Sequence, residues 1–174
     1  MSRLIESICL SNGVFHRLPY HQARMDDAFR EILHHQNQIQ LSDFLHSQPY
    51  PVQGLFKCRI VYEKHSHVVE FLPYTAKPIT SLKMVRADNI EYAYKFENRS
   101  ALHQLYQLRE DCDDILIVKN GFITDSYYSN VILYDRADWF TPSTPLLAGT
   151  MRQYLLETGK ISEAAIRVED VRLF

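Results

Sequence analysis

The distribution of apolar residues near the start of the chain predicts a β-hairpin followed by a helix. Two apolar-rich runs, Leu4 to Leu10 and Val14 to Leu18, flank the sequence Ser11-Asn12-Gly13. Asn-Gly favours a type I′ turn, because both central residues of that turn need a positive φ. Apolar side chains then recur with the period of a helix, which predicts a helix over 21–35 with one buried face. These side chains are Met25, Ala28, Phe29 and Ile32.

The pattern from residue 42 to residue 86 predicts short elements interrupted by prolines. Pro73 and Pro78 lack a backbone N–H and therefore end the strand pattern in their region. The expected elements are a short helix over 42–46 and strands over 55–62, 67–72 and 83–86.

The second half of the chain is expected to mix strands with two helices. Helices are predicted over 98–109, where Asn98 can supply the N-cap, and over 149–157, which Gly159 ends. Asn120-Gly121 predicts a second hairpin turn. The expected strands cover 89–94, 115–118, 122–125, 131–134 and 165–168. Taken together, the two halves predict an α+β fold.

Composition and charge narrow the class of protein. The chain has 174 residues, of which 46% are hydrophobic, so it can bury a sizeable core in one domain or two small lobes. Its formal net charge is only −2, with both signs interspersed. We therefore expect neither nucleic acid nor an anionic membrane as its main partner. No apolar run is long enough to span a bilayer, and no signal-peptide pattern is found at the N-terminus.

The cysteines and histidines do not predict a metal site or a disulfide framework. The three cysteines are Cys9, Cys58 and Cys112, which lie far apart and are odd in number. This usage fits a reducing cytoplasm. His34 and His35 point apart on a helix, and His65-x-His67 has no third ligand at a suitable spacing. We therefore expect no metal.

Lys95 is the first candidate for chemistry. It follows the predicted strand over 89–94 and lies between two aromatic residues, Tyr94 and Phe96. Partial desolvation in such surroundings favours the neutral amine over the ammonium. A neutral amine can form a Schiff base with an aldehyde cofactor. The alternative is an ordinary surface lysine at the end of a strand, and these residues alone do not separate the two.

Four landmarks in a fixed order give the chain a family resemblance. It resembles the class IV aminotransferases, the fold-type IV group of pyridoxal-phosphate enzymes that includes branched-chain and D-amino-acid aminotransferases and aminodeoxychorismate lyase. The resemblance runs from about Ile5 to the C-terminus. The landmarks are His21-x-x-Arg24, Lys95, Gly121-Phe122-Ile123-Thr124-Asp125 with Asn130, and Pro145-Leu146-Leu147-Ala148-Gly149-Thr150-Met151-Arg152.

This resemblance implies pyridoxal 5′-phosphate as cofactor, with Lys95 as the Schiff-base amine and the base that moves the substrate α-proton. It places Asp125 opposite the pyridine nitrogen, where the family usually has glutamate. The aspartate keeps the charge but is one methylene shorter. The alternative is that Asp125 only accepts hydrogen bonds from loop amides.

The same resemblance implies a phosphate site. Arg24 offers a forked guanidinium, and the backbone N–H groups of Thr150 and Met151 lie at a helix N-terminus. The alternatives are a salt bridge of Arg24 on an exposed helix face, for example with Asp27, and an ordinary N-cap at Thr150. Asn130 is expected to organise the loop after Asp125, in a role that is either cofactor-related or purely structural.

The resemblance also implies an architecture. We expect a small α+β lobe over 1–88 that carries the phosphate-binding arginine, followed by a larger lobe over 89–174 with mixed strands in a barrel-like arrangement and the lysine. Full-size members continue beyond the position of Phe174 into another strand and a loop that helps to hold the phosphate and the substrate carboxylate. Substrate recognition is therefore the part of the site that this sequence supports least.

Three functions follow from the resemblance. The first is an aminotransferase that acts on a small-molecule amino acid. The second is an aminodeoxychorismate lyase, which forms 4-aminobenzoate and pyruvate in folate synthesis and shares the first steps at the lysine. The third is a non-catalytic remnant of the fold, suggested by Asp125 and the short C-terminus. Members of the family are commonly homodimers, so we expect a homodimer as well.

Overall fold

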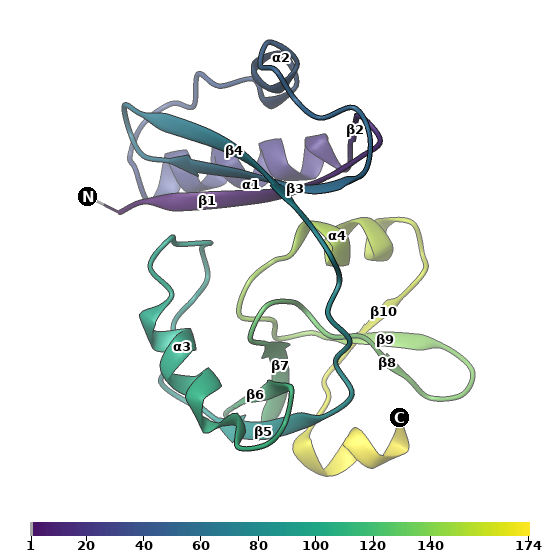
Figure 1. The fold of residues 1–174 in the computed structure, drawn as a ribbon. Helices are drawn as coiled ribbons and strands as arrows, with labels where there is room; N and C mark the ends of the chain where they lie inside the picture. Colours follow the sequence, from purple (N-terminus) through teal and green to yellow (C-terminus); the bar gives the residue numbers. More distant parts are fainter. Residues whose placement is uncertain (1) are drawn as a thin grey trace. The chain divides into compact units, whose positions relative to one another are not determined.

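The computed structural model describes residues 2–174 and divides them into two compact units. The first unit contains Met1–Lys77 together with Tyr94–Asn98, and the second contains Pro78–Ala93 and Arg99–Phe174. Both units combine strands with short helices, which confirms the predicted α+β class (Figure 1). The functional division into 1–88 and 89–174 stays a prediction.

The first unit is a four-stranded antiparallel sheet in the order β2-β1-β3-β4. The predicted hairpin is confirmed, since Asn12 and Gly13 both have a positive φ. The strands are β1 (Leu4–Ser11), β2 (Val14–Phe15), β3 (Leu55–Tyr62) and β4 (His67–Pro73), and the helices are α1 (Leu18–Glu31) and α2 (Leu41–His46).

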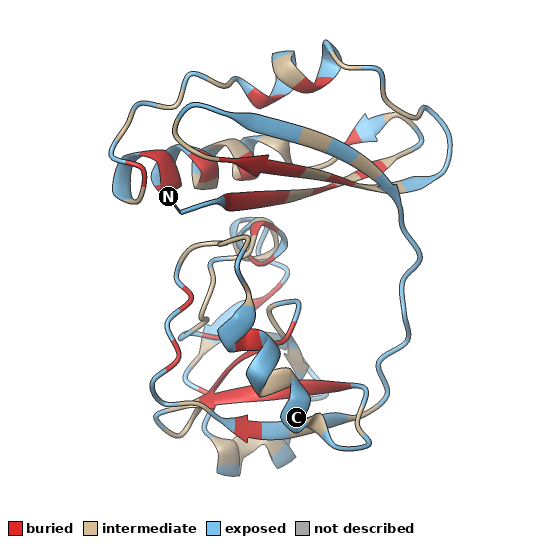
Figure 2. Cartoon of the chain, turned by 60° about the vertical axis from the view of Figure 1, so that its left-hand side comes forward, coloured by how far each residue is buried: buried red, intermediate tan, exposed pale blue. Residues whose placement is uncertain are grey.

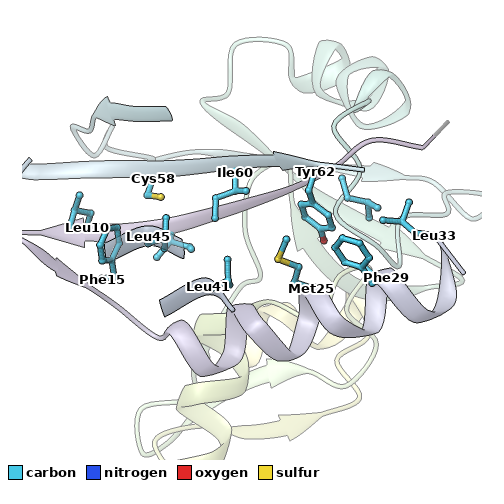
Figure 3. Packing of buried hydrophobic residues seen from close by; sticks show 13 residues of the cluster. Leu10, Phe15, Met25, Phe29, Leu33, Leu41, Leu45, Cys58, Ile60 and Tyr62 are labelled. Carbon is cyan, nitrogen blue, oxygen red and sulfur yellow. The ribbon is translucent and has the colours of Figure 1, made fainter. Parts of the chain in front are cut away.

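Helix α1 covers one face of this sheet and buries the predicted apolar stripe. Figure 3 shows Met25 and Phe29 pointing from α1 toward Ile60 and Tyr62 of β3. The rings of Phe29 and Tyr62 stack with their centroids 5.5 Å apart. The helix begins at Leu18, earlier than predicted, because Pro19 fits its first turn. Figure 2 shows buried positions along β1 and β3, as expected for the strands in the middle of the sheet.

The second unit contains two three-stranded sheets. In one, β6 pairs with β5 in parallel and with β7 in antiparallel orientation; in the other, β9 pairs with β10 and β8. The strands are β5 (Leu82–Arg86), β6 (Asp114–Lys119), β7 (Phe122–Ser126), β8 (Leu133–Tyr134), β9 (Trp139–Pro142) and β10 (Ser162–Ala164). The helices are α3 (Ser100–Tyr106), η1 (Gln107–Arg109), α4 (Thr150–Glu157) and η2 (Val168–Leu173).

Burial in the second unit is concentrated on β6 and β7. Every residue of β6 except Lys119 is buried, as predicted for this apolar run. Leu116, Val118 and Ile123 form a cluster with Ile166, against which Phe140 and Phe174 pack. Asp125 therefore lies near the end of a strand that is buried in a packed core.

The predicted strand over 89–94 is wrong. Ile90 and Tyr92 are buried, which produces the alternating pattern, but no strand pairs with this segment. Instead the chain turns after β5, and the Ile90 N–H donates to the Ala87 carbonyl. The next residues pair with the first unit, where Phe96 forms an antiparallel bridge with Leu4 of β1. The apolar alternation therefore reflects burial and not strand pairing.

Two other predicted boundaries are also corrected. Asn98 does not cap a helix, because α3 begins at Ser100 with Arg99 as its N-cap residue. The last strand is formed by 162–164, in parallel pairing with β9, and not by 165–168. Residues after Arg167 form η2, because the Asp170 side chain accepts from the Arg167 N–H and favours a helical turn.

Candidate functional site

Arg24 lies on the buried side of α1 and contacts a carboxylate from the sheet. Its Nε and Nη2 donate to the two oxygens of Glu6 at 2.9 and 2.5 Å. The Glu6 side chain is fully buried, and the Arg24 side chain is 15% exposed. The predicted alternative partner, Asp27, pairs with Arg30 instead. Arg24 is therefore an oriented, largely buried guanidinium and not a surface ion pair.

His21 completes this cluster from one turn earlier on α1. Its Nδ1 lies 2.6 Å from Glu6 Oε2. Burial lowers the pKa of His21, and this effect outweighs Glu6, which raises it. Burial alone would raise the pKa of Glu6, but Arg24 and His21 together hold it below its usual value. We infer a charged Glu6 that accepts from Arg24 and from a neutral His21.

Lys95 lies in the short segment that pairs with the N-terminal end of β1. Its carbonyl accepts a hydrogen bond of 2.9 Å from the Ile5 N–H, and the Glu97 N–H donates to the Arg3 carbonyl at the same distance. Glu97 also pairs with Arg59 of β3 at 2.8 Å. Lys95 is partly buried. The backbone from the Lys95 carbonyl to Glu97 is thus hydrogen-bonded to β1 and to the residue before it.

Asp125 lies on β7 in the second unit and is 6% exposed. Its Oδ1 accepts from Asn130 Nδ2 at 2.7 Å, and its Oδ2 accepts from the N–H groups of Leu146 and Leu147 at 2.9 and 3.1 Å. Burial raises the pKa of Asp125 above its usual value, and these donors limit that rise. The loop-amide contacts considered for Asp125 in the sequence are therefore present.

Asn130 connects Asp125 to the segment that precedes α4. Its Nδ2 also donates to the Leu147 carbonyl at 2.8 Å. Its Oδ1 lies so close to Gly149 that a Cβ on that glycine would be 1.9 Å away. The glycine is required here by this close approach, since its φ of −76° is open to any residue. Asn130 thereby fixes the loop between β7 and α4.

Helix α4 begins at Thr150 and ends before Gly159, as predicted. Its N-cap residue is Gly149, and no side chain caps the helix there. Thr150 is buried, whereas Met151 is 47% exposed. The first turn of α4 therefore presents the positive end of its dipole next to a glycine, which is a typical arrangement for anion binding.

Two residues near these positions were not singled out from the sequence. Glu6 is one; the signal was a single acid in the apolar run of the first predicted strand. Arg99 is the other. Its guanidinium lies 4.5 Å from the ring centroid of Tyr127 and 5.1 Å from that of Tyr128, and it donates to the Tyr127 carbonyl. No sequence pattern marks Arg99, because its partners lie far along the chain.

The structure thus groups the predicted site residues within each unit. Asp125, Asn130, Thr150 and Met151 lie in the second unit, in the region that Asn130 connects. Arg24 and Lys95 lie in the first unit, one on α1 and one beside β1. Within residues 2–174, no group of three or more His, Cys, Asp and Glu side chains could hold a metal ion. In the same range, no helix is long and apolar enough to cross a membrane.

The residues present fit pyridoxal phosphate. A carboxylate has about four acceptor positions, and three donors reach Asp125, which leaves one position for a pyridine N–H. The first turn of α4, which no side chain caps, suits a phosphate, and a Cβ at Gly149 would displace Asn130 from its place beside this turn. In the first unit, Arg24 has an oriented guanidinium and Lys95 is a partly buried amine, which are the types of group that such a cofactor would need.

Comparison with known proteins points to one family. The model of the family described as amino-transferase class IV matches residues 67–174. An uncharacterized protein of Haemophilus influenzae is 36% identical over 174 residues, covering 98% of this chain and 92% of that protein. A shorter match, 43% identical over 53 residues, is to a candidate aminodeoxychorismate lyase of Schizosaccharomyces pombe, of which it covers 23%.

Solved structures agree with this result. A candidate 4-amino-4-deoxychorismate lyase from Haemophilus somnus is 32% identical, with a TM-score of 0.92 over 99% of this chain and 92% of that one. A candidate amino-acid aminotransferase from Mesorhizobium loti has a TM-score of 0.80 at 18% identity, covering 99% of this chain and 91% of that one. The second likeness concerns the fold alone.

Proposed function

The chain belongs to the class IV aminotransferase family, whose members are pyridoxal-phosphate enzymes, and on that premise we propose that it transaminates a small-molecule amino acid with Lys95 as the essential amine. The observation that carries this proposal is the fixed arrangement of Asp125, Asn130 and Gly149 at the start of α4. It joins a buried acid on β7 to the start of α4, which no side chain caps, and these are the two features that the two ends of the cofactor need.

Each residue has a separate task in this proposal. When bound, the cofactor supplies an electron sink for the pair left behind on the substrate α-carbon. Asp125 keeps a proton on the pyridine nitrogen by hydrogen bonding, while Asn130 and the two loop amides hold the carboxylate in place. Arg24 and the N–H groups of Thr150 and Met151 bind the phosphate.

Lys95 Nζ binds the cofactor aldehyde and later takes and returns the α-proton of the substrate. The backbone contacts around Lys95 limit its motion to the side chain itself. The shared role of Lys95 and Asp125 in this proposal is supported by the family to which the chain belongs. Within the second unit, Arg99 donates to the carbonyl of Tyr127, which follows Asp125 by two residues.

The proposal is tested by visible absorption spectra with and without added pyridoxal phosphate. We expect a new absorption band for the wild type and for Lys119→Ala, but not for Lys95→Ala. Lys119 is a suitable control, because its Nζ binds the Ile90 carbonyl and Glu91, away from the proposed roles. Borohydride reduction should then attach the cofactor to the Lys95 peptide. A wild-type absorption spectrum that does not change when pyridoxal phosphate is added would contradict the proposal.

A second candidate function is aminodeoxychorismate lyase. The names of the Haemophilus somnus and Schizosaccharomyces pombe proteins favour it, since both are more than 25% identical to this chain where they match. Lys95 and Asp125 serve both reactions, because the first proton transfers are the same. Product analysis separates them: the lyase releases pyruvate from aminodeoxychorismate, whereas the aminotransferase converts an amino acid into its keto acid.

Two broader expectations accompany the proposal. Homodimerisation and a cytoplasmic location stay predictions, and size-exclusion chromatography with light scattering would test the first of them. A monomer in solution would contradict the expected homodimer.

A further inference from the structure

The inward face of β1 carries one charged residue in an apolar row. Leu4, Glu6, Ile8 and Leu10 all point toward the core of the first unit, and all four are at most 1% exposed. A buried carboxylate is unfavourable unless it is paired, and a well-packed apolar residue usually stabilises a core at least as well. The backbone of Glu6 pairs with Ile60 as any residue would. The fold itself therefore does not need an acid at this position.

What the acid does is visible in its contacts. Two nitrogens of the Arg24 guanidinium, Nε and Nη2, donate to the two Glu6 oxygens, so the plane of the fork is fixed. His21 holds Glu6 Oε2 from the other side at 2.6 Å. His21 and Arg24 are three residues apart on α1 and therefore share a face of the helix. The carboxylate is clamped by two side chains of one helix.

This clamp fixes the plane in which Arg24 holds its guanidinium. A guanidinium recognises phosphate through parallel N–H bonds from one edge, so its orientation matters more than its charge. A long arginine side chain otherwise samples many rotamers, and binding has to restrict them. With Glu6 in place, that restriction exists before any ligand arrives.

We propose that Glu6 is a positioning residue for the cofactor phosphate, which acts through Arg24 and does not itself touch the cofactor. This inference rests on the proposed function. The competing explanation is a salt bridge that only stabilises the core of the first unit. The two differ in one respect: positioning acts on the phosphate specifically, whereas loss of core stability weakens binding of the whole cofactor.

The experiment compares the affinity of the apoprotein for pyridoxal 5′-phosphate with its affinity for pyridoxal, which has the same ring and aldehyde but no phosphate. In Glu6→Gln the side-chain NH2 group would face an N–H of Arg24. Both groups are hydrogen-bond donors, so we expect the guanidinium to change its orientation. We expect the dissociation constant for pyridoxal 5′-phosphate to rise about tenfold or more, while that for pyridoxal changes less than about twofold. Circular dichroism and thermal unfolding of each apoprotein monitor folding independently of activity.

Ile8→Val is the matched control, because Ile8 is the next inward residue on the same strand and touches the same core. It should lower stability while leaving the ratio of the two affinities unchanged. In an Arg24→Ala background, Glu6→Gln should produce no further change in that ratio. If Glu6→Gln does not fold, Glu6→Asp takes its place, since the shorter acid keeps the charge but cannot reach both nitrogens equally.

The outcomes are distinguishable. A wild type that shows no spectral response to pyridoxal 5′-phosphate removes the proposed function and this inference with it. A wild type that binds, together with a Glu6 variant that weakens both ligands equally or neither, overturns the positioning role alone. A stronger preference for the phosphate form in Glu6→Gln would also overturn it, because the acid would then act only by reducing the positive charge.

Discussion

Asn130 occupies the space in which a side chain on Gly149 would have to lie, since a Cβ there would come within 1.9 Å of Asn130 Oδ1. The same asparagine donates to Asp125 and to the Leu147 carbonyl. One side chain thus ties the acid on β7 to the start of α4. A change at either residue should disturb both.

Gly149→Ala should destabilise the second unit by about 2–4 kcal/mol, because a displaced Asn130 leaves buried partners without their hydrogen bonds. Chemical denaturation of the apoprotein measures this. In an Asn130→Ala background the space is free, so the added cost of Gly149→Ala should largely disappear. Equal costs in both backgrounds would show that the close approach is not what requires the glycine.

Asp125→Asn should lower the turnover number by roughly 10² or more, because an amide cannot hold the proton on the pyridine nitrogen. Steady-state kinetics with saturating cofactor checks this. The matched control is Asp113→Asn. Asp113 also holds a loop in place, because it accepts hydrogen bonds from the N–H and hydroxyl groups of Thr80 and Ser81, but it does not belong to the proposed cofactor site. It should reduce stability and leave turnover nearly unchanged.

The stability of the apoprotein should fall in acid because of Glu6. Its pKa is lowered in the folded state relative to the ordinary value of 4.5. The unfolded chain therefore binds more protons below that value, and stability decreases as the pH falls from 4.5 through the lowered pKa. Urea unfolding at a series of pH values should show this slope for the wild type and a shallower slope for Glu6→Gln. Parallel slopes would contradict the assigned charge state.

Arg99→Lys should slow turnover by about tenfold with a stability loss near 1 kcal/mol. The lysine keeps the charge but not the planar contact with Tyr127 and Tyr128, so the loop after Asp125 loosens. Arg167→Lys is the control, since Arg167 also lies over an aromatic ring, 4.8 Å from the centroid of Phe122 at the start of β7. If both variants lose equal activity, the loop next to Asp125 has no special role.

Much of the local structure could be predicted from the sequence, because its signals are local. The Asn-Gly turns and the helix that begins at Thr150 depend on φ preferences and spacing within a few residues. The strand predicted over 89–94 failed for the opposite reason. Buried side chains alternate there, but whether a strand forms depends on a free sheet edge, which the segment itself cannot encode.

The residues of the candidate site also differ in whether a local sequence signal identifies them. The family landmarks identified Lys95, Arg24 and Asp125 as candidates, because each is a charged residue in a recognisable order. They could not identify Glu6 or Arg99, whose roles depend on partners that the fold brings near them. An acid in an apolar run was the visible clue to Glu6, and interpreting it required knowing that Arg24 faces it across the core.

The pairing of Phe96 with Leu4 has a consequence for how the protein is made. Leu4 of β1 is synthesised long before Phe96. During synthesis, the backbone N–H and C=O groups on this edge of β1 therefore lack the partner that they have in the folded protein. An affinity tag at the N-terminus should therefore slow formation of the native structure around Lys95 more than a tag at the C-terminus.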